Sequence, residues 1–174
     1  MEDNSLLSLE TITMPFSLEA EQAVLGSVLV DPSCLSQAAV YISPESFYLP
    51  QHNAIFAAML MLDGMGPKID PLVVLDQLVQ QGIYDSAAGK NYLFELAQMV
   101  PSTANVEMYA KIVREKFYIR TLIKISSETI ESAVAQEETA DALLDNAEQK
   151  IYNIRQGKTT NAPSKLKHII VNKV

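Results

Sequence analysis

Apolar residues recur at helical spacing along most of this chain, and the longest such pattern lies in its second half. Neither glycine nor proline occurs between Pro101 and Gly157, while apolar side chains return there every three or four residues. A polar sequence at residues 136–139 interrupts the pattern once, and Thr139 or Asp141 is placed to cap a second helix after it. Two helices joined by so short a loop fold back on each other, so the pattern predicts an antiparallel helical hairpin.

The hairpin is predicted over residues 105–156, and its first arm of about 30 residues would be ~45 Å long at ~1.5 Å per residue. An arm of that length exceeds the width of a small domain, so we expect part of the hairpin to project and its apolar stripe to need a partner. The candidates for packing within the hairpin, or for pairing with a second chain, are Val113, Phe117, Leu122, Ile130, Leu143, Leu144 and Ile151.

Shorter helical patterns fill the first half of the chain. Ser17 is placed to cap the first helix, where Glu19 and Glu21 lie near the positive end of the helix dipole. Further helices are predicted to begin at Asp31-Pro32, with a pattern that runs to Ile42, at Pro50, at Asp70-Pro71 and after a loop over residues 83–89. No alternating strand pattern of four or more residues occurs, so the predicted fold is all-α, with a small helical globular domain before the hairpin.

These patterns divide the chain into four expected segments. Residues 1–15 form a flexible tail, residues 16–104 the globular domain, and residues 105–156 the hairpin. Residues 157–174 begin as a polar linker and continue as an amphipathic helical pattern that stops without a cap. A chain that stops inside such a pattern looks cut from a longer protein.

Composition places the chain among globular proteins. Hydrophobic residues make up 48% of it, enough for a substantial core, and no apolar run approaches the ~18 residues of a membrane span. The acidic start, which includes Glu2 and Asp3, is unlike a secretory signal, so we expect a cytosolic protein. The single cysteine, Cys34, lies among apolar residues and is interpreted as a small buried hydrophobe rather than a reactive thiol.

Charge is distributed unevenly within a net charge of −8. Residues 1–104 carry 12 acidic residues against Lys68 and Lys90 alone, a net charge of −10, while residues 157–174 carry four lysines and no acid. A domain at −10 repels phosphate backbones. We therefore expect no direct DNA binding by the globular part, and a basic protein surface is the expected charged partner.

Two features of the sequence look like ligand-binding sites, but the residues around them do not fit such sites. The sequence Gly157–Thr159 matches the end of a phosphate-binding P-loop, but Tyr152 stands where the first glycine belongs and a predicted helix, not a strand, precedes it. The two histidines, His52 and His168, have no cysteine or acid at metal-ligand spacing. His52 follows Pro50 in the first turn of a predicted helix and is interpreted as a solvated or capping residue. The sequence thus predicts no catalytic, cofactor-binding or metal site.

The first helical pattern carries a long and specific motif. Residues 15–26 read PFSLEAEQAVLG, and this string resembles the opening of the N-terminal domain of bacterial DnaB-type replicative DNA helicases. The resemblance covers about residues 15–174, through landmarks in the same order: Phe47-Tyr48, His52, Ile55-Phe56, Ile69-Asp70, Gly89, Tyr92-Leu93, Pro101-Ser102, Asn105-Val106, Tyr109-Ala110 and Ile112-Val113. One departure is Ala88, which stands where the family usually has a second glycine and leaves the geometry of that loop in question.

The resemblance implies a role in assembly and partner docking. In that family such domains form a collar of six subunits, a trimer of dimers paired through their hairpins, on which the primase docks. Carried over by position, the primase contacts would fall on Glu19, Tyr92 and Ile123. Ordinary packing explains Tyr92 and Ile123 equally well, and a helix-dipole role explains Glu19 at least as well as docking does.

The resemblance also implies a larger protein. Lys165–Val174 would begin the linker helix that leads to a RecA-like ATPase domain beyond this sequence. The intact protein would bind ATP and Mg and unwind duplex DNA at the replication fork, in the cytoplasm of a bacterium or in an equivalent organelle. From residues 1–174 alone we expect no cofactor and no activity, and a helicase loader is a further candidate partner.

Two other interpretations stay open from the residues. One is an acidic, all-α adaptor or regulatory protein that forms dimers through its hairpin and has no helicase role. The other is a small helical enzyme. Binding to primase distinguishes the adaptor from the helicase domain, and an ATPase assay tests the enzyme.

Overall fold

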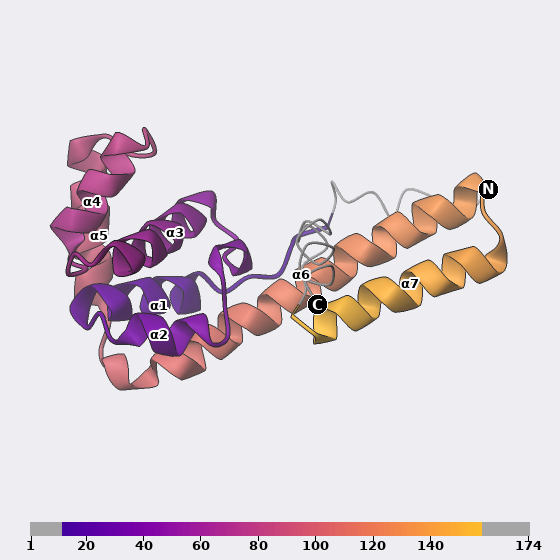
Figure 1. The fold of residues 1–174 in the computed structure, drawn as a ribbon, viewed down its shortest axis with the longest axis horizontal. Helices are drawn as coiled ribbons and strands as arrows, with labels where there is room; N and C mark the ends of the chain where they lie inside the picture. Colours follow the sequence, from indigo (N-terminus) through magenta and orange to yellow (C-terminus); the bar gives the residue numbers. More distant parts are fainter. Residues whose placement is uncertain (1–11, 158–174) are drawn as a thin grey trace, which may run out of the picture. The chain divides into compact units, whose positions relative to one another are not determined.

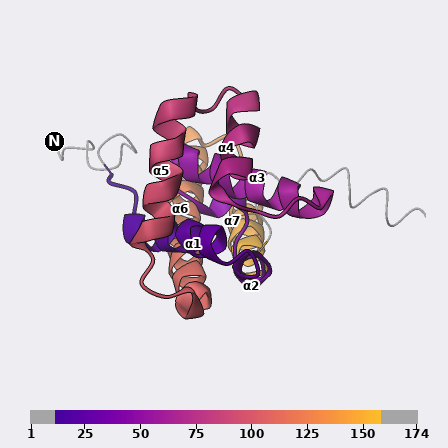
Figure 2. The ribbon, with the colours of Figure 1, turned by 90° about the vertical axis from the view of Figure 1, so that its left-hand side faces the viewer.

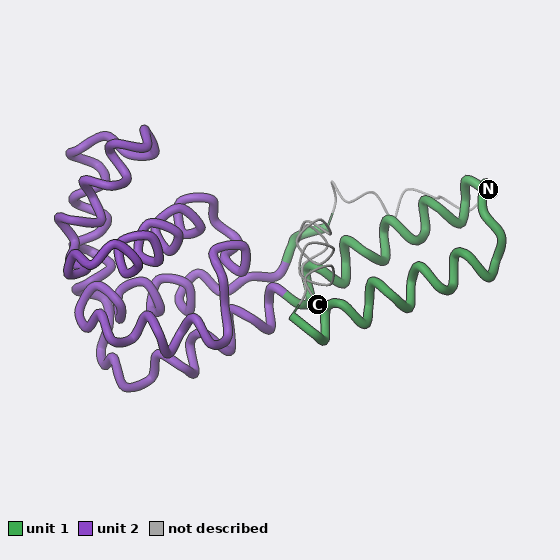
Figure 3. Tube along the Cα trace, viewed as in Figure 1, with its two compact units in different colours: residues 1–14, 118–174 green, residues 15–117 purple. Residues whose placement is uncertain are grey.

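The computed structural model describes residues 12–157, and every regular element in that range is helical (Figures 1 and 2). The all-α fold predicted from the sequence is therefore confirmed. The chain divides into two compact units: unit 1 comprises Met1–Met14 and Tyr118–Val174, and unit 2 comprises Pro15–Phe117 (Figure 3). The boundaries of the four predicted segments stay predictions, and their parts at residues 1–11 and 158–174 lie outside the described residues.

Unit 2 holds a single helical core. Its helices are α1 (Leu18–Val30), α2 (Cys34–Ala39), α3 (Pro50–Met65), α4 (Pro71–Gln80), α5 (Ser86–Met99) and the start of α6 (Val106–Ala135), with short 3₁₀ turns at Pro44–Ser46 and Thr103–Asn105. Helix α1 packs against α5 and α3, and α4 packs against α3 and α5. Leu25, Phe56 and Leu93 are fully buried where these helices meet, so the apolar stripes read from the sequence do face one core.

The close approach of α1 to α5 depends on a glycine. A Cβ atom at Gly26 would stand 2.2 Å from the carbonyl oxygen of Leu96 and 2.4 Å from Cγ2 of Val100. Both distances are far shorter than a van der Waals contact. Gly26 therefore sets the spacing of α1 and α5.

Helix starts follow the sequence signals closely. The side chain of Ser17 caps α1, that of Asp70 caps α4, and that of Thr139 caps α7 (Ala140–Arg155), each by accepting hydrogen bonds from backbone N–H groups of the first turn. These groups have no partner inside their own helix, so a capping oxygen stabilises each start. The predicted caps are confirmed, and of the two candidates for α7 it is Thr139 that caps the helix.

Two predicted boundaries are wrong. The loop predicted over residues 83–89 gives way to α5 early, because the side chain of Asp85 accepts hydrogen bonds from two backbone N–H groups of the first turn. The helix predicted over residues 31–42 is only α2, which ends at Ala39. Shortly beyond it, Ser43 is extended and precedes a proline, a position that disfavours helical backbone.

Unit 1 contains the helical hairpin. Nζ of Lys150 on α7 lies 3.2 Å from Oε2 of Glu128 on α6, and Gly157, just beyond α7, lies near the hydroxyl of Tyr118. Residue numbers rise on one arm as they fall on the other, so the arms are antiparallel, as Figure 3 shows. Gln136, with a φ of 55°, turns the chain out of α6. The predicted hairpin is confirmed for the described residues, while its projection stays a prediction.

Candidate docking surfaces

A buried chain of polar side chains joins α1, α3 and α5. Glu21 on α1 and His52 on α3 are 1% and 0% exposed, and Nδ1 of His52 lies 2.8 Å from Oε1 of Glu21. Nε2 of His52 lies 2.6 Å from the hydroxyl of Tyr92 on α5, with the two rings nearly parallel. This Glu21–His52–Tyr92 network ties three helices of unit 2 together through hydrogen bonds.

The carboxylate of Glu21 also caps the start of α3. The backbone N–H groups of Tyr48 and Leu49 donate to its two oxygens, at 3.0 and 3.4 Å. Helix α3 has no capping side chain of its own and opens with Pro50, which lacks an N–H group. The dipole of α3 favours a negative charge at this end, so these donors and the dipole compensate the burial of Glu21.

The hydrogen-bond pattern assigns the protons of the network. Burial raises the pKa of the Tyr92 hydroxyl, a hydrogen bond from Gln22 lowers it, and the carboxylates of Glu95 and Glu21 raise it further. Tyr92 therefore keeps its proton and donates it to Nε2 of His52, which leaves the ring proton on Nδ1, facing Glu21. Within residues 12–157, no buried side-chain nitrogen or oxygen lacks a hydrogen-bond partner.

The sequence predicts a solvated or capping side chain at His52, and this prediction is wrong. Pro50 does place His52 in the first turn of α3, but that turn is covered, and the side chain bonds to α1 and α5. A signal for the network was present in the first helix, where Glu21 falls at helical spacing with Val24 and Val28, both fully buried. An acid on an apolar stripe indicates a buried partner, and here that partner is His52.

The predicted docking residues of unit 2 differ in what they offer to a partner. Glu19 is exposed on α1 and borders a pocket of about 320 Å³. That pocket is lined by Ser17, Glu19, Ala20, Ala23, Met99, Pro101, Tyr109 and Ile112. Tyr92 is half-buried and its hydroxyl is engaged by His52, so a partner reaches only part of its ring.

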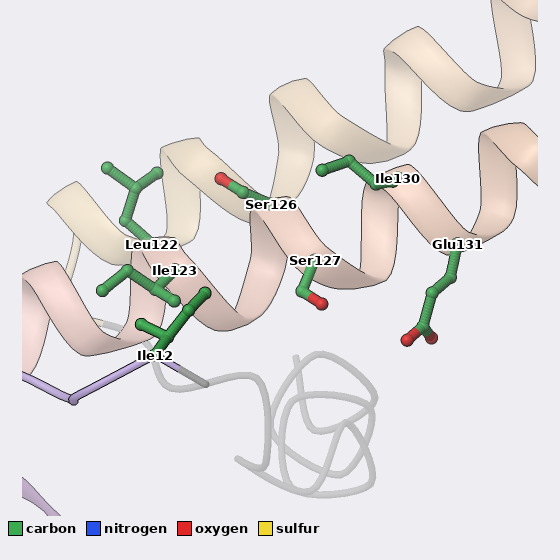
Figure 4. Close-up of a pocket in the computed structure, with 7 residues that line it drawn as sticks. All are labelled: Ile12, Leu122, Ile123, Ser126, Ser127, Ile130 and Glu131. Carbon is green, nitrogen blue, oxygen red and sulfur yellow. The ribbon is translucent and has the colours of Figure 1, made fainter. Parts of the chain in front are cut away.

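The third predicted docking residue, Ile123, belongs to unit 1. It is half-buried and lines a groove of about 290 Å³ on α6 (Figure 4). The other residues that line this α6 groove are Ile12, Leu122, Ser126, Ser127, Ile130 and Glu131. Glu19 and Tyr92 belong to unit 2, so the predicted contacts are not gathered into one site within a single unit.

The structure separates the hairpin candidates by their burial. Val113 is 2% exposed and belongs to the core of unit 2, and Phe117 is half-buried in the same unit. In unit 1, Leu143 is half-buried, whereas a larger group keeps 43 to 60% of its surface exposed: Leu122, Ile130, Leu144 and Ile151. Among these candidates, the side chains with the most exposed apolar surface therefore lie in unit 1.

Outside these surfaces, the described part of the chain offers few residues for metal binding or catalysis. No group of three or more His, Cys, Asp or Glu side chains in residues 12–157 can hold a metal ion, and no helix there is long and apolar enough to cross a membrane. Cys34 is buried as predicted, and burial, followed by the charge of Asp31, raises the pKa of its thiol, which disfavours the reactive thiolate. His168 and Lys158-Thr159 lie outside the described residues.

Comparison with known proteins gives one consistent result. A family model described as "DnaB-like helicase N terminal domain" matches residues 13–115. The replicative DNA helicase DnaB of Geobacillus stearothermophilus is 41% identical over 157 residues, which cover 90% of this chain and 35% of that protein. The replicative DNA helicase DnaC of Bacillus subtilis (strain 168) is 36% identical, with the same coverage. The chain spans about a third of the length of these curated relatives.

Solved structures agree with the sequence comparisons. The crystal structure of the N-terminal domain of DnaB helicase from Mycobacterium tuberculosis matches with a TM-score of 0.75 at 31% identity, covering 81% of this chain and 99% of that one. A DnaB-like replicative helicase, studied together with its interactions with primase, matches with a TM-score of 0.65 at 25% identity, covering 91% of this chain and 35% of that one. Both similarities extend well beyond the short motif at residues 15–26.

Proposed function

Because this chain belongs to the family of DnaB-like helicase N-terminal domains, we propose that it is the assembly and primase-docking part of a replicative DNA helicase. The observation that carries the proposal is the likeness to replicative helicases along 90% of the chain. That likeness reaches from the helices that hold the Glu21–His52–Tyr92 network into the hairpin. If the chain were an unrelated helical adaptor, a match of this length to replicative helicases would not be expected.

The intact protein would combine this part with a motor. In the proposal, ATP and Mg²⁺ serve an ATPase region outside this sequence, and no residue of this chain is assigned to either. The motor would unwind duplex DNA at the replication fork in the bacterial cytoplasm, and a helicase loader is a further candidate partner.

Primase is proposed to contact both candidate surfaces, the pocket bordered by Glu19 and the α6 groove that contains Ile123. Charge supports this choice of partner at the pocket, because unit 2 carries 11 acidic and five basic residues, and its net −6 attracts a basic surface. Met99 and Ile112 add apolar contact area at the pocket. Tyr92 would contribute its ring, since its hydroxyl is held by His52. The related helicase studied with its primase is a precedent for such a contact.

Self-association is proposed to proceed through the hairpin. Exposed apolar stripes on helices favour burial against another chain. The largely exposed apolar side chains of unit 1 include Leu122, Ile130, Leu144 and Ile151. If each hairpin pairs with one neighbour, dimers form first, and three dimers can close into a ring of six.

Ile123→Asp tests both parts of the proposal. An unpaired charge in a buried contact costs several kcal/mol, so we expect either a shift toward monomer or loss of primase binding with the mass unchanged. Light scattering across concentration gives the mass, and surface binding gives the primase affinity. Val134→Asp is the matched control for the primase measurement, because Val134 lies on the same helix, is 75% exposed and does not line the groove.

Two results would contradict the proposal. If Ile123→Asp changes neither mass nor primase affinity, Ile123 belongs to neither contact. If the unaltered chain dimerises but binds no primase at any concentration, an acidic adaptor explains it better.

A further inference from the structure

The α6 groove runs along one face of its helix. Its lining residues on α6 fall in pairs four positions apart, at 122 and 123, 126 and 127, and 130 and 131, which places them on one side over two turns. The apolar members are Leu122, Ile123 and Ile130, and two serines between them add little bulk. Small residues flanked by large apolar ones make a shallow trough that an apolar segment can fill.

One apolar side chain from far away in the sequence already lies in this groove. Ile12 lines it together with the α6 residues, and Figure 4 shows its side chain beside Ile123. Both residues belong to unit 1. In Figure 4, Ile12 lies at the end of the groove formed by Leu122 and Ile123, whereas Ile130 lies farther along α6, so the groove extends beyond Ile12.

The sequence before Ile12 has the composition that this groove needs. Residues 6–9 read Leu-Leu-Ser-Leu, so three leucines precede Ile12 within a short reach. The polar groups that line the groove are two serines and Glu131, so apolar contacts are what the groove offers most to an occupant. Apolar complementarity therefore points to residues 6–12 as that occupant.

We propose that residues 6–12 are the ligand of the α6 groove, bound to the helix of their own chain. The bound segment covers Ile123, so it competes with any partner that uses this residue. This competitive role rests on the proposed function, whereas the binding itself does not. The segment also screens apolar surface of unit 1 from unspecific association.

A photo-cross-linking side chain at position 9, in place of Leu9, tests the binding in the full chain. Mass spectrometry of a tryptic digest should find it joined to residues 121–124 or 125–150, the peptides of the groove. A mixture of isotopically labelled and unlabelled chains should show that both halves of the product come from one chain. Ile123→Asp should remove most of the product, and Val134→Asp, outside the groove, should leave it unchanged.

The proposal is overturned by cross-links that fall elsewhere, that join two chains, or that are equally abundant in Ile123→Asp.

The competition between residues 6–12 and primase has a separate measurement. Replacing Leu6, Leu7 and Leu9 by serine should raise primase affinity by the inverse of the fraction of time that the groove is free. An unchanged affinity overturns the competition. Primase that binds neither version contradicts the proposed function and leaves the cross-linking result intact.

Discussion

Glu21 accepts hydrogen bonds from three groups at once, the N–H groups of Tyr48 and Leu49 and the imidazole of His52. Glu21→Ala would leave these donors buried without an acceptor and would open a small void between α1 and α3. We expect the free energy of unfolding to fall by ~1–3 kcal/mol or more, the cost of leaving a buried donor without its acceptor. Urea denaturation followed by circular dichroism measures this loss.

Glu19 provides the control on the same helix. It lies two residues earlier and is exposed, so Glu19→Ala removes only a favourable interaction with the dipole of α1. Its effect on stability should be far smaller than that of Glu21→Ala. Equal effects of the two substitutions would mean that the carboxylate of Glu21 contributes nothing through its buried partners.

Tyr92 allows stability and docking to be separated at one residue. Tyr92→Phe removes the hydroxyl that donates to Nε2 of His52 and leaves that nitrogen unsatisfied, at a cost of ~1–3 kcal/mol. The ring remains, so primase binding at a temperature where both proteins are folded should be unchanged. Tyr92→Ala should weaken primase binding as well. If Tyr92→Phe abolishes binding without loss of stability, the hydroxyl itself contacts the partner.

At the scale of helices, the contact of α1 with α5 gives a sharp prediction. Gly26→Ala forces a Cβ atom against the carbonyl of Leu96, and because backbone cannot move aside as a flexible side chain does, the helices must separate. Overpacking of this kind costs ~1–3 kcal/mol. Gly64→Ala, in α3 with no atom within 4 Å of the added Cβ, should instead stabilise by ~0.5–1 kcal/mol. Thermal or urea unfolding of both variants checks the opposite signs.

The predictable parts of this fold are those encoded locally. Ser17, Asp70 and Thr139 act within one helical turn of their own position, so the residue types alone identify the helix starts. The burial of His52 depends on α1 and α5, which lie about 30 and 40 residues away in sequence, and no local pattern encodes that. The only local signal of the network in the sequence is Glu21, an acid on the apolar face of α1.

The hairpin shows the same limit at its surface. Val113 and Leu144 both occupy apolar helical positions in the sequence, yet Val113 is 2% exposed and Leu144 is 60% exposed. Which of them is covered depends on the tertiary neighbours of each arm, and periodicity carries no information on those neighbours. The docking role of Glu19, Tyr92 and Ile123 came from family resemblance alone, and their exposure now defines how each can be tested.

For the molecule as a whole, charge sets how a docking partner arrives. Unit 2, residues 15–117, carries 11 acidic and five basic residues, a net charge of −6, and it contains the pocket bordered by Glu19. If primase presents a basic surface, its association is steered by this field at long range. The Debye length falls from ~10 Å at 0.1 M salt to ~3 Å at 1 M, so association should slow with salt more than dissociation quickens.

Glu19→Lys should lower the association rate of primase further at low salt, because it replaces a negative by a positive charge at the edge of the proposed contact without burying anything. Glu45→Lys makes the same change of charge at another exposed position of unit 2, away from the pocket lining. Surface binding at several ionic strengths should therefore give a smaller decrease for Glu45→Lys, with helix content and mass unchanged in both variants. Equal decreases would show that only net charge matters, and an association rate indifferent to salt and to both substitutions would place docking on apolar contacts or on another surface.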